Sequence, residues 1–435
     1  MIFIYQCIAK EIIVSLVKKG GILKAKLGTF AILLAFFSTE LFAGGFQINE
    51  HSAKAMAMGG AFTAIANDAS AVYFNGAGLT QLTGTNILIG TTAIAPVSTF
   101  RGVYPDITEY GTEKKVFFPT HAWVAHRFSE KIAAGIGFTI PYGLETNWDQ
   151  NWVGRYLAIQ TRLFVFTISP VVAYKFSDQL SVSAGLIYSW SNVKITSKTP
   201  QTPFPGDAFA TLDGKDNSAF GFSFGLLMKP DPRFTIGASL RSQLDFAFDG
   251  TVTTIGATQL ASELPNGSAS AKLTTPINVT LGLAYDVLPE LKLSADFEYV
   301  GWSSYDKLVV DFTDPNYQDI HSPRLYDNSY IIRLGGDYKL SDMFGVQAGI
   351  YFDKTPVSAK FVNPTLPDAN RLGLSCGVSI KPMENLEINA AYLFIRASEL
   401  SVTNSEEYYT SGNSPFNGTY NSYANLASIG ISYSL

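Results

Sequence analysis

The last eleven residues of the chain, NLASIGISYSL, alternate between two kinds of side chain. Ile429, Ile431, Tyr433 and Leu435 share one parity, and the residues between them are serine and glycine. Because successive side chains of a β-strand point to opposite faces, this segment predicts a strand with one apolar and one small, polar face. A strand that ends in this way is best placed beside the first strand of a closed sheet, since closure leaves no free edge.

The same alternation recurs from about residue 86 onward, for example in PINVTLGLAYD, LKLSADFEY and YIIRLGGDY. One face of each segment is apolar, and the other carries polar and charged side chains, which indicates water or paired charges on that side. We expect these charges to pair with one another inside the fold, with an ion-selective lining as the alternative: Arg233, Arg241, Asp245, Asp296, Glu298, Arg333 and Asp337.

The connections between these segments alternate in length, with tight polar turns such as FSEK and FSDQ following long loops. Fourteen strands are bounded in this way, near 87–99, 117–128, 131–146, 158–176, 180–198, 218–229, 233–249, 272–286, 291–312, 328–340, 344–354, 370–381, 386–402 and 421–435. An even strand number with short turns at one end is typical of an outer-membrane barrel. Only helices or closed barrels satisfy the backbone in hydrocarbon. The predicted fold is therefore an all-β, fourteen-stranded antiparallel transmembrane β-barrel; a soluble array of β-sandwiches is the alternative.

The net charge, the cysteines and the histidines argue against several classes of function. The net charge of −5 argues against nucleic acid as a partner, because phosphate binding needs basic clusters. Two cysteines provide neither a disulfide framework nor a metal site, and the four histidines lack the spacing of metal ligands. We expect no cofactor, no metal and no enzymatic activity, although a Ser-His-acid hydrolase assembled across strands stays open.

The first 43 residues read as a signal peptide. Lysines precede the apolar run LGTFAILLAFF, and a small residue, Ala43, stands before Gly44-Gly45 at the predicted cut. A membrane-anchoring helix is the alternative, and residues 1–20 extend far enough upstream to suggest a start of translation assigned too early. After Ala43 no apolar run is long enough for a transmembrane helix.

Residues 44–85 do not follow the rhythm of the barrel, which we assign to residues 86–435. The segment is rich in glycine and alanine, and Asn67 or Asp68 could cap a short helix that Asn75-Gly76 ends. Its apolar side chains favour burial over exposure to water. We expect a hatch of short helices that plugs the barrel lumen, with a flexible periplasmic leader as the alternative.

Several stretches carry a resemblance to a known family. GGFQINEHSAKAMAMGGAFTAIANDASAVYFNGAGL, IPYGLETNWDQNWVGRYLAI and IYFDKTPVSAKFVNPTLPDANRLGLSCGV resemble the FadL/TodX family of outer-membrane transporters for long-chain fatty acids and other hydrophobic compounds. The resemblance covers essentially the whole chain after the signal peptide. It implies a fourteen-stranded barrel with an N-terminal hatch, in agreement with the strand count.

Two motifs follow from the resemblance. The family's Asn-Pro-Ala hatch motif is matched by Asn75, Gly76 and Ala77, and glycine in place of proline should make the hatch more pliable. The family's kinked third strand, which leaves a lateral gap, maps to Ile140-Pro141-Tyr142-Gly143. Pro141 has no N–H for a neighbouring strand and Gly143 permits a bend, which supports that placement. A proline at the outer end of the strand is the alternative.

The function implied is passive uptake of hydrophobic compounds, either long-chain fatty acids or aromatic hydrocarbons. Cargo would land among the extracellular loops, pass Phe46 and the hatch, and leave sideways through the gap at 140–143. Trp148 and Trp152 could form an apolar landing surface or an aromatic girdle, and Arg155 could attract a carboxylate or a lipopolysaccharide phosphate.

Two lysines, Lys194 and Lys198, are weaker candidates for a carboxylate and could equally be solvated loop charges. The expected partners are hydrophobic small molecules, outer-membrane lipid and lipopolysaccharide. We expect a monomer in the outer membrane of a Gram-negative bacterium, with both termini in the periplasm. The alternatives are a water-filled porin for small polar solutes and a barrel that anchors an adhesin or lipid hydrolase.

Overall fold

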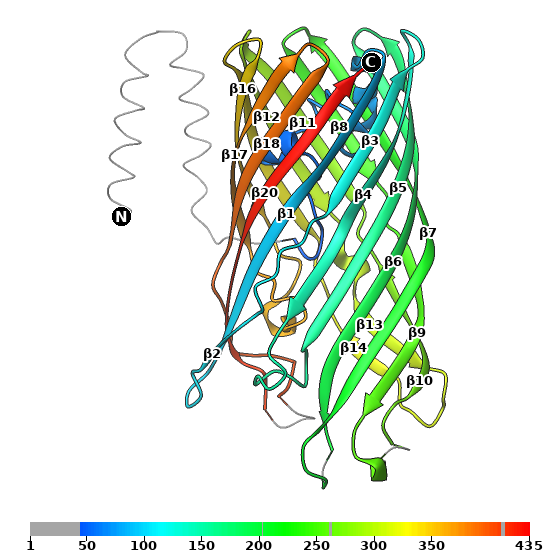
Figure 1. The fold of residues 1–435 in the computed structure, drawn as a ribbon, viewed down its shortest axis with the longest axis vertical. Coiled ribbons are helices and arrows are strands. Elements are labelled where there is room, and N and C mark those ends of the chain that lie inside the picture. Colours follow the sequence, from blue (N-terminus) through cyan, green and yellow to red (C-terminus); the bar gives the residue numbers. More distant parts are fainter. Residues whose placement is uncertain (1–43, 202, 261–262, 410–413) are drawn as a thin grey trace, which may run out of the picture. The chain divides into compact units, whose positions relative to one another are not determined.

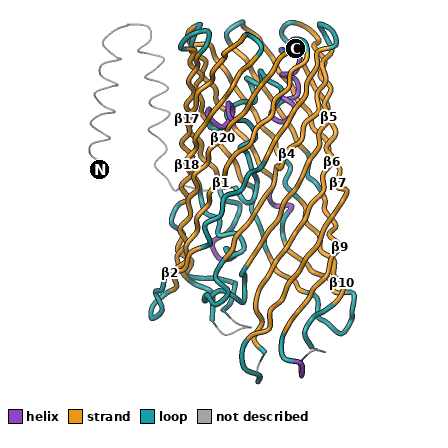
Figure 2. The backbone as a smooth tube through the Cα atoms, in the orientation of Figure 1, coloured by secondary structure: helices purple, strands orange, loops and turns teal. Residues whose placement is uncertain are grey.

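The computed structural model describes residues 44–201, 203–260, 263–409 and 414–435, so the predicted signal peptide lies outside it. In the described part, fourteen antiparallel strands close into a ring (Figure 1; Figure 2). The ring closes where the first strand pairs with the last, from Asn86 opposite Ser434 to Gly102 opposite Gly418. The predicted barrel is confirmed. None of the described helices is long and apolar enough to cross a bilayer.

The strands of the ring are, in order, β1 (Thr85–Gly102), β3 (Thr120–Arg127), β4 (Ile132–Asn147), β5 (Gln160–Ser177), β6 (Leu180–Pro200), β7 (Asp207–Asp231), β8 (Phe234–Arg241), β11 (Asn278–Leu288), β12 (Leu291–Val300), β15 (Ser329–Lys339), β16 (Phe344–Asp353), β17 (Arg371–Met383), β18 (Leu386–Ala397) and β20 (Gly418–Ser434). Shorter strands extend the sheet on the side of the long connections: β2 (Glu109–Gly111), β9 (Asp245–Ile255), β10 (Gly267–Thr274), β13 (Lys307–Phe312), β14 (Ile320–Pro323) and β19 (Leu400–Val402). Figure 1 shows the short turns together at the end that holds the C-terminus.

The two faces of the wall differ as the alternation predicts. On β20, Ile429 and Ile431 are about half exposed, at 51% and 49%, whereas Ser428 is 5% exposed. Apolar side chains therefore coat the outside of the ring, where a bilayer provides their solvent, and small polar side chains point inward.

Four predicted strands are each divided into two, and one of them, 386–402, separates into β18 and the short β19. The segment 233–249 forms β8 and β9, and β7 pairs with β8 as far as Ser223 opposite Arg241 and with β9 from Lys215 opposite Asp249. Between these pairings, side chains replace part of the ladder: the Asp216 carboxylate accepts the Ala247 N–H at 2.7 Å, and the Ser242 hydroxyl accepts the Phe222 N–H at 2.9 Å. We refer to this interruption as the β7–β9 seam.

The other two divisions follow the same pattern. The segment 272–286 separates into β10 and β11 at Pro276, which cannot donate to a ladder, and 291–312 separates into β12 and β13 at the short 3₁₀ helix η3 (Trp302–Ser304). Two further 3₁₀ turns, η2 (Thr258–Leu260) and η4 (Ala359–Phe361), lie in long connections.

Residues 44–84, which we call the hatch, lie inside the ring. They form helices α3 (Ala53–Ala57) and α4 (Ala71–Phe74) and the 3₁₀ helix η1 (Gly76–Gln81). The Ser52 hydroxyl caps α3 by accepting the Ala55 N–H. Asp68 accepts the Ser70 N–H ahead of α4, and Asn75 ends α4 and caps η1.

The hatch touches each of the fourteen ring strands in the described part of the chain. Inward-facing glycines make this possible, because a Cβ on any of them would lie within 3 Å of a hatch atom: Gly225, Gly237, Gly282, Gly335, Gly349 and Gly377. Glycine in a strand allows such close approach of another backbone. The hatch thus occupies the centre of the ring.

Candidate functional site

The wall is interrupted between β3 and β4. Their pairing runs from Arg127 opposite Ala133 to Ala122 opposite Phe138 and stops there, although β4 continues to Asn147. On its other side, β4 shifts register against β5 between Thr139 and Tyr142. The shift falls on Ile140 and Pro141, the predicted kink, where proline supplies no N–H to a ladder.

A short part of the hatch takes up the pairing that β3 leaves. We call residues 44–50 the strap. The Ile48 N–H donates to the Pro141 carbonyl at 2.9 Å, and the Gly143 N–H donates to the Phe46 carbonyl at 3.0 Å. Gln47 and Tyr142 stand opposite each other in this bridge. Gly143 allows this close approach, since a Cβ would lie 2.7 Å from Ile48 Cδ1.

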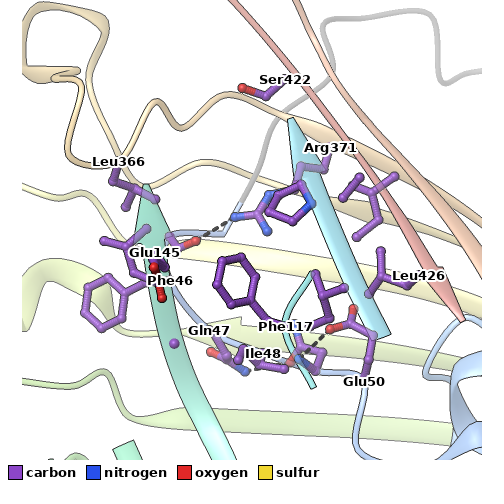
Figure 3. A pocket seen from close by; sticks show the side chains of 18 of the residues that line it. Phe46, Gln47, Ile48, Glu50, Phe117, Glu145, Leu366, Arg371, Ser422 and Leu426 are labelled. Carbon is purple, nitrogen blue, oxygen red and sulfur yellow. Dashed lines mark hydrogen bonds between the residues drawn. The ribbon is translucent and has the colours of Figure 1, made fainter. Parts of the chain in front are cut away.

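A cavity of about 540 Å³ adjoins the strap (Figure 3). Its lining includes Glu50 and Leu426 from the inside of the ring, and also Phe164 and Phe166. These two phenylalanines lie on the outward parity of β5, because Leu163 and Val165 between them point inward and are buried. The cavity therefore reaches from the interior to the outer side of the wall, next to Ile140 and Gly143, which also line it.

Aromatic rings hold the strap in place. The Phe46 ring lies edge-on to Trp302 at 4.7 Å and to Tyr142 at 6.0 Å between centroids. The Tyr142 hydroxyl accepts a hydrogen bond from the Asn278 side chain at 3.2 Å. Gly45 has φ +68°, and a Cβ there would lie 2.6 Å from Trp302. Phe46 and Tyr142 thus join the strap to β4 and also to η3 and β11.

A polar group closes the cavity opposite this aromatic cluster. The Arg371 guanidinium donates from Nη2 to the Gly45 carbonyl at 2.6 Å and to Asp368 Oδ1 at 3.1 Å. Asp368 Oδ2 accepts from the Gly45 N–H and from the Thr355 hydroxyl. Burial raises the pKa of the Glu50 carboxyl. Figure 3 shows Arg371 and Glu50 around Phe46.

The second motif, Asn75-Gly76-Ala77, lies away from this cavity, at the contact of the hatch with β5, β6 and β7. The Asn75 side chain donates to the Thr63 and Leu226 carbonyls at 2.9 Å each, and accepts the Ala77 N–H at 3.2 Å. A Cβ on Gly76 would lie 2.5 Å from Val171 Cγ1. The glycine therefore sits tightly against the wall, and the added pliability expected of it stays a prediction.

Trp148 and Trp152 do not lie on a surface. Both are buried, their rings stack at 4.2 Å, and their indole N–H groups donate to the Pro364 and Ala158 carbonyls at 3.0 and 2.7 Å. Both expectations for them, a landing surface and a girdle, are wrong. They form the core that holds the outer loops together.

The candidate cations of the outer loops are engaged elsewhere. Arg155 pairs with Asp207 at 2.9 Å, and Lys198 binds Asn151 at 3.0 Å and lies 4.0 Å from Asp207. Lys194 stands opposite Arg162 in the β5–β6 register and so shares its face of the wall. None of the three lines the cavity.

Several of the inward charges bind the hatch, which corrects in part the expectation that they pair with one another. Arg333 and Glu298 do pair, at 2.6 Å. Asp296, however, accepts the N–H groups of Phe62 and Thr63, and Arg241 stacks on Tyr73 at 3.7 Å and bonds its hydroxyl. The remaining members of the set lie outside this network: Asp337 accepts from Gln347, and Arg233 and Asp245 are exposed.

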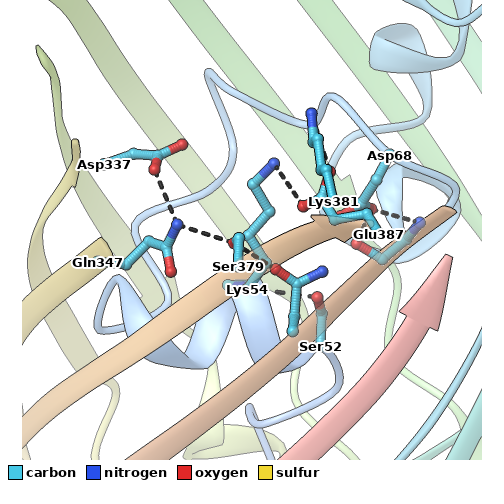
Figure 4. Close-up of polar contacts among 11 residues, drawn as sticks. Ser52, Lys54, Asp68, Asp337, Gln347, Ser379, Lys381 and Glu387 are labelled. Carbon is cyan, nitrogen blue, oxygen red and sulfur yellow. Dashed lines mark hydrogen bonds and ion pairs between the residues drawn. The ribbon is translucent and has the colours of Figure 1, made fainter. Parts of the chain in front are cut away.

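A further ionic group fixes α3 to the wall (Figure 4). Lys54 pairs with Glu387 at 3.3 Å, and Glu387 also pairs with Lys381 at 3.2 Å. Gln347 links Asp337 to Ser379 in the same region. No group of three or more potential metal ligands occurs among the described residues. The sequence did not identify Lys54 or the pairing of the strap with β4, because the partners lie more than 90 residues away.

The closed ring, its internal hatch and the cavity beside the strap define a plugged outer-membrane transport barrel. Residues 34–435 match the family described as outer membrane protein transport protein (OMPP1/FadL/TodX), and the chain belongs to that family. It is a protein of the outer membrane, and the family consists of proteins that transport hydrophobic compounds.

Individual relatives are distant. The chain is 25% identical to the putative outer membrane protein NMB0088 of Neisseria meningitidis over 84% of this chain and 89% of that one. It is 23% identical to the long-chain fatty acid transport protein of Escherichia coli K12, over 91% and 97%. Among solved structures, a Pseudomonas aeruginosa FadL homologue aligns with a TM-score of 0.81 at 21% identity, covering 90% of this chain and 99% of that one. The Pseudomonas putida toluene transporter TodX aligns with a TM-score of 0.72 at 16% identity, over 91% and 99%. These structures share the fold.

Proposed function

We propose that the protein carries hydrophobic molecules passively across the outer barrier of the cell and releases them sideways into the bilayer between β3 and β4. One observation carries the proposal: the cavity beside the strap is lined both by inward residues and by Phe164 and Phe166 of the outer face, where the β3–β4 pairing has ended. An apolar molecule in that cavity is separated from lipid by the strap and its neighbours.

The direction of release follows from solvation. The hatch occupies the straight route through the ring, and an apolar solute gains nothing by entering water on the far side. A sideways route delivers it to hydrocarbon. Backbone N–H and C=O groups that face lipid need hydrogen-bond partners. In the described arrangement the strap supplies them to the Gly143 N–H and the Pro141 carbonyl. Release therefore needs the strap to move.

Several assignments accompany this function. We place the signal peptide at 1–43, an N-terminal plug at 44–85, which comprises the hatch and the first residue of β1, and the rest of the barrel at 86–435. The apolar outside of the ring contacts lipid and, in the outer leaflet, lipopolysaccharide. The protein acts as a monomer, without a cofactor and without catalysis.

A matched pair of variants tests the lateral route. Gly143→Trp fills the break, and Ala390→Trp places the same ring on the exposed outer parity of β18. Uptake of a radiolabelled alkylbenzene is measured in cells that lack other transporters of this family. We expect about a tenfold loss for Gly143→Trp and little change for Ala390→Trp. Heat-modifiable migration on gels confirms that both barrels fold. Normal uptake by a folded Gly143→Trp barrel would refute the lateral route.

A further inference from the structure

The cavity beside the strap is acidic as well as apolar. Its described lining includes four carboxylates, Glu50, Glu145, Asp353 and Asp368, against a single cation, Arg371. The rest of the lining is mostly aliphatic and aromatic. This balance bears on which hydrophobic molecules the cavity accepts, because a fatty acid carries a negative charge at neutral pH whereas a hydrocarbon carries none.

Arg371 already has an anionic partner. Its Nη2 lies 3.1 Å from Asp368 Oδ1 and 2.6 Å from the Gly45 carbonyl, so the guanidinium both neutralises Asp368 and holds the strap. Glu145 is served by Lys115, which lies 3.6 Å away. These pairs leave Glu50 and Asp353 without a direct salt bridge among the described residues, because the two guanidiniums that act on them, Arg371 and Arg333, are paired with Asp368 and Glu298.

Removal of the predicted signal peptide does not reverse this balance. A cut after Ala43 would create an ammonium on Gly44, whose Cα lies against Asp353: a Cβ there would be 2.3 Å from Asp353 Oδ1. That ammonium would balance Asp353, and Glu50 would still be in excess. Either way, the described lining of the cavity offers no cation that lacks an anionic partner.

Burial makes an added anion unfavourable. Desolvation raises the pKa of the Glu50 carboxyl, which shows that the cavity already disfavours a negative charge. A carboxylate on the cargo would lose its water in the same place and would face Glu50 as well. Uncompensated burial of an ionised carboxylate is among the most unfavourable transfers in proteins.

We propose that the cavity selects uncharged hydrocarbons, aromatic ones included, and rejects carboxylates of the same size. The aromatic part of the lining, Phe46, Phe117, Phe164 and Phe166, suits such cargo through ring contacts. The inference rests on the proposed transport function, because it concerns the cargo of the same cavity.

A competition experiment tests this selectivity. The full-length protein is purified in detergent with bound N-phenyl-1-naphthylamine, and the fluorescent probe is displaced at neutral pH with hexylbenzene, 6-phenylhexanoate or 6-phenylhexylamine. We expect hexylbenzene to displace the probe at a concentration about tenfold lower than the carboxylate does, a ratio set by burial of the charge. Binding of the carboxylate as tight as that of hexylbenzene would overturn the proposal. Tighter binding of the amine would also overturn it, since the acids would then recruit cations.

Two variants separate charge from packing. Glu50→Gln keeps the shape of the side chain, and Glu384→Gln makes the same change in an exposed turn. We expect Glu50→Gln to improve the displacement by 6-phenylhexanoate several-fold without changing that by hexylbenzene, and Glu384→Gln to change neither. An unchanged ratio in folded Glu50→Gln protein would refute the role of the acidic lining. If none of the three compounds displaced the probe, the transport proposal itself would fail, a result distinct from a preference for the carboxylate.

Discussion

The wall is interrupted both between β3 and β4 and at the β7–β9 seam, and the two places are closed by different means. At β4, the missing partner is replaced by the strap, which is a separate piece of chain and can leave. At the seam, it is replaced by the wall's own side chains, Asp216 and Ser242, and Leu244 fills the space that Gly221 leaves, where a Cβ would lie 2.7 Å from Leu244 Cδ2.

The difference teaches that a break in a ladder is not in itself an opening. Two hydrogen bonds join the strap to β4 at the first break, and each contributes about 0.5–1.5 kcal/mol net. Because this total is small, binding of cargo can displace the strap. The side chains of the seam are tethered to the strands they join. We therefore expect cargo to pass at the first break, and we expect the contacts at the second to stabilise the folded barrel.

A reversible tether across the first break should have the largest effect. Gln47→Cys with Tyr142→Cys, in a Cys376→Ser background, places two thiols at the bridged positions of strap and β4. We expect oxidation to reduce uptake of an alkylbenzene at least about tenfold, because the strap cannot move, and a reductant to restore it. Uptake that persists with the disulfide formed would show that the strap is not the gate.

Truncation of Leu244, the side chain that fills the β7–β9 seam, should lower the stability of the barrel rather than its uptake of cargo. Leu244 is 3% exposed, and Leu244→Ala should lower the free energy of unfolding by about 2–5 kcal/mol through the cavity it leaves. Unfolding in urea, followed by tryptophan fluorescence, measures the loss. Uptake through this variant, measured in the oxidised strap-tethered background, should stay low; recovery of uptake would mean that the seam is a second route.

The polar closure of the seam should contribute less. Asp216→Ala leaves the Ala247 N–H without its acceptor and should cost about 1–3 kcal/mol. The same urea titration measures it, and Asp213→Ala on the exposed face of β7 serves as the control. Equal effects of the two substitutions would show that the carboxylate of Asp216 does not close the ladder.

The smallest effect is expected at Gly143. At close range a Cβ there meets only the flexible end of Ile48, at 2.7 Å. Gly143→Ala should therefore displace the strap at an energetic cost of less than about 1 kcal/mol. Hydrogen exchange of the strap amides should then be several-fold faster, with exchange in the rest of the hatch unchanged. Slower exchange would indicate that the added methyl tightens the closure.

Alternation with a period of two predicted most of the ring, because each strand separates an apolar from a polar environment. The break at β4 was also predictable, since Pro141 carries a chemical reason for it. The β7–β9 seam was not. Leu240, Leu244 and Phe246 all stand at even positions, yet Leu240 points outward in β8 and Phe246 inward in β9.

The same pattern has opposite meanings along the ring. Within the bilayer the apolar face is outside, and in the extended outer part, where water surrounds the sheet, it is inside. Sequence alternation does not record which solvent applies. The tryptophans of the loop core escaped prediction for a related reason: aromatic composition does not reveal a partner such as Pro364, which lies 216 residues from Trp148.

That contact between Trp148 and Pro364 joins the connection after β4 to the connection after β16, and Thr146 reinforces it by donating to the Thr365 carbonyl at 3.1 Å. The surface formed by the outer loops is consequently assembled from stretches of chain that meet only after folding. A linear peptide copied from either connection would not reproduce this surface, so antibodies against the native outer loops have to be raised with the intact, folded protein.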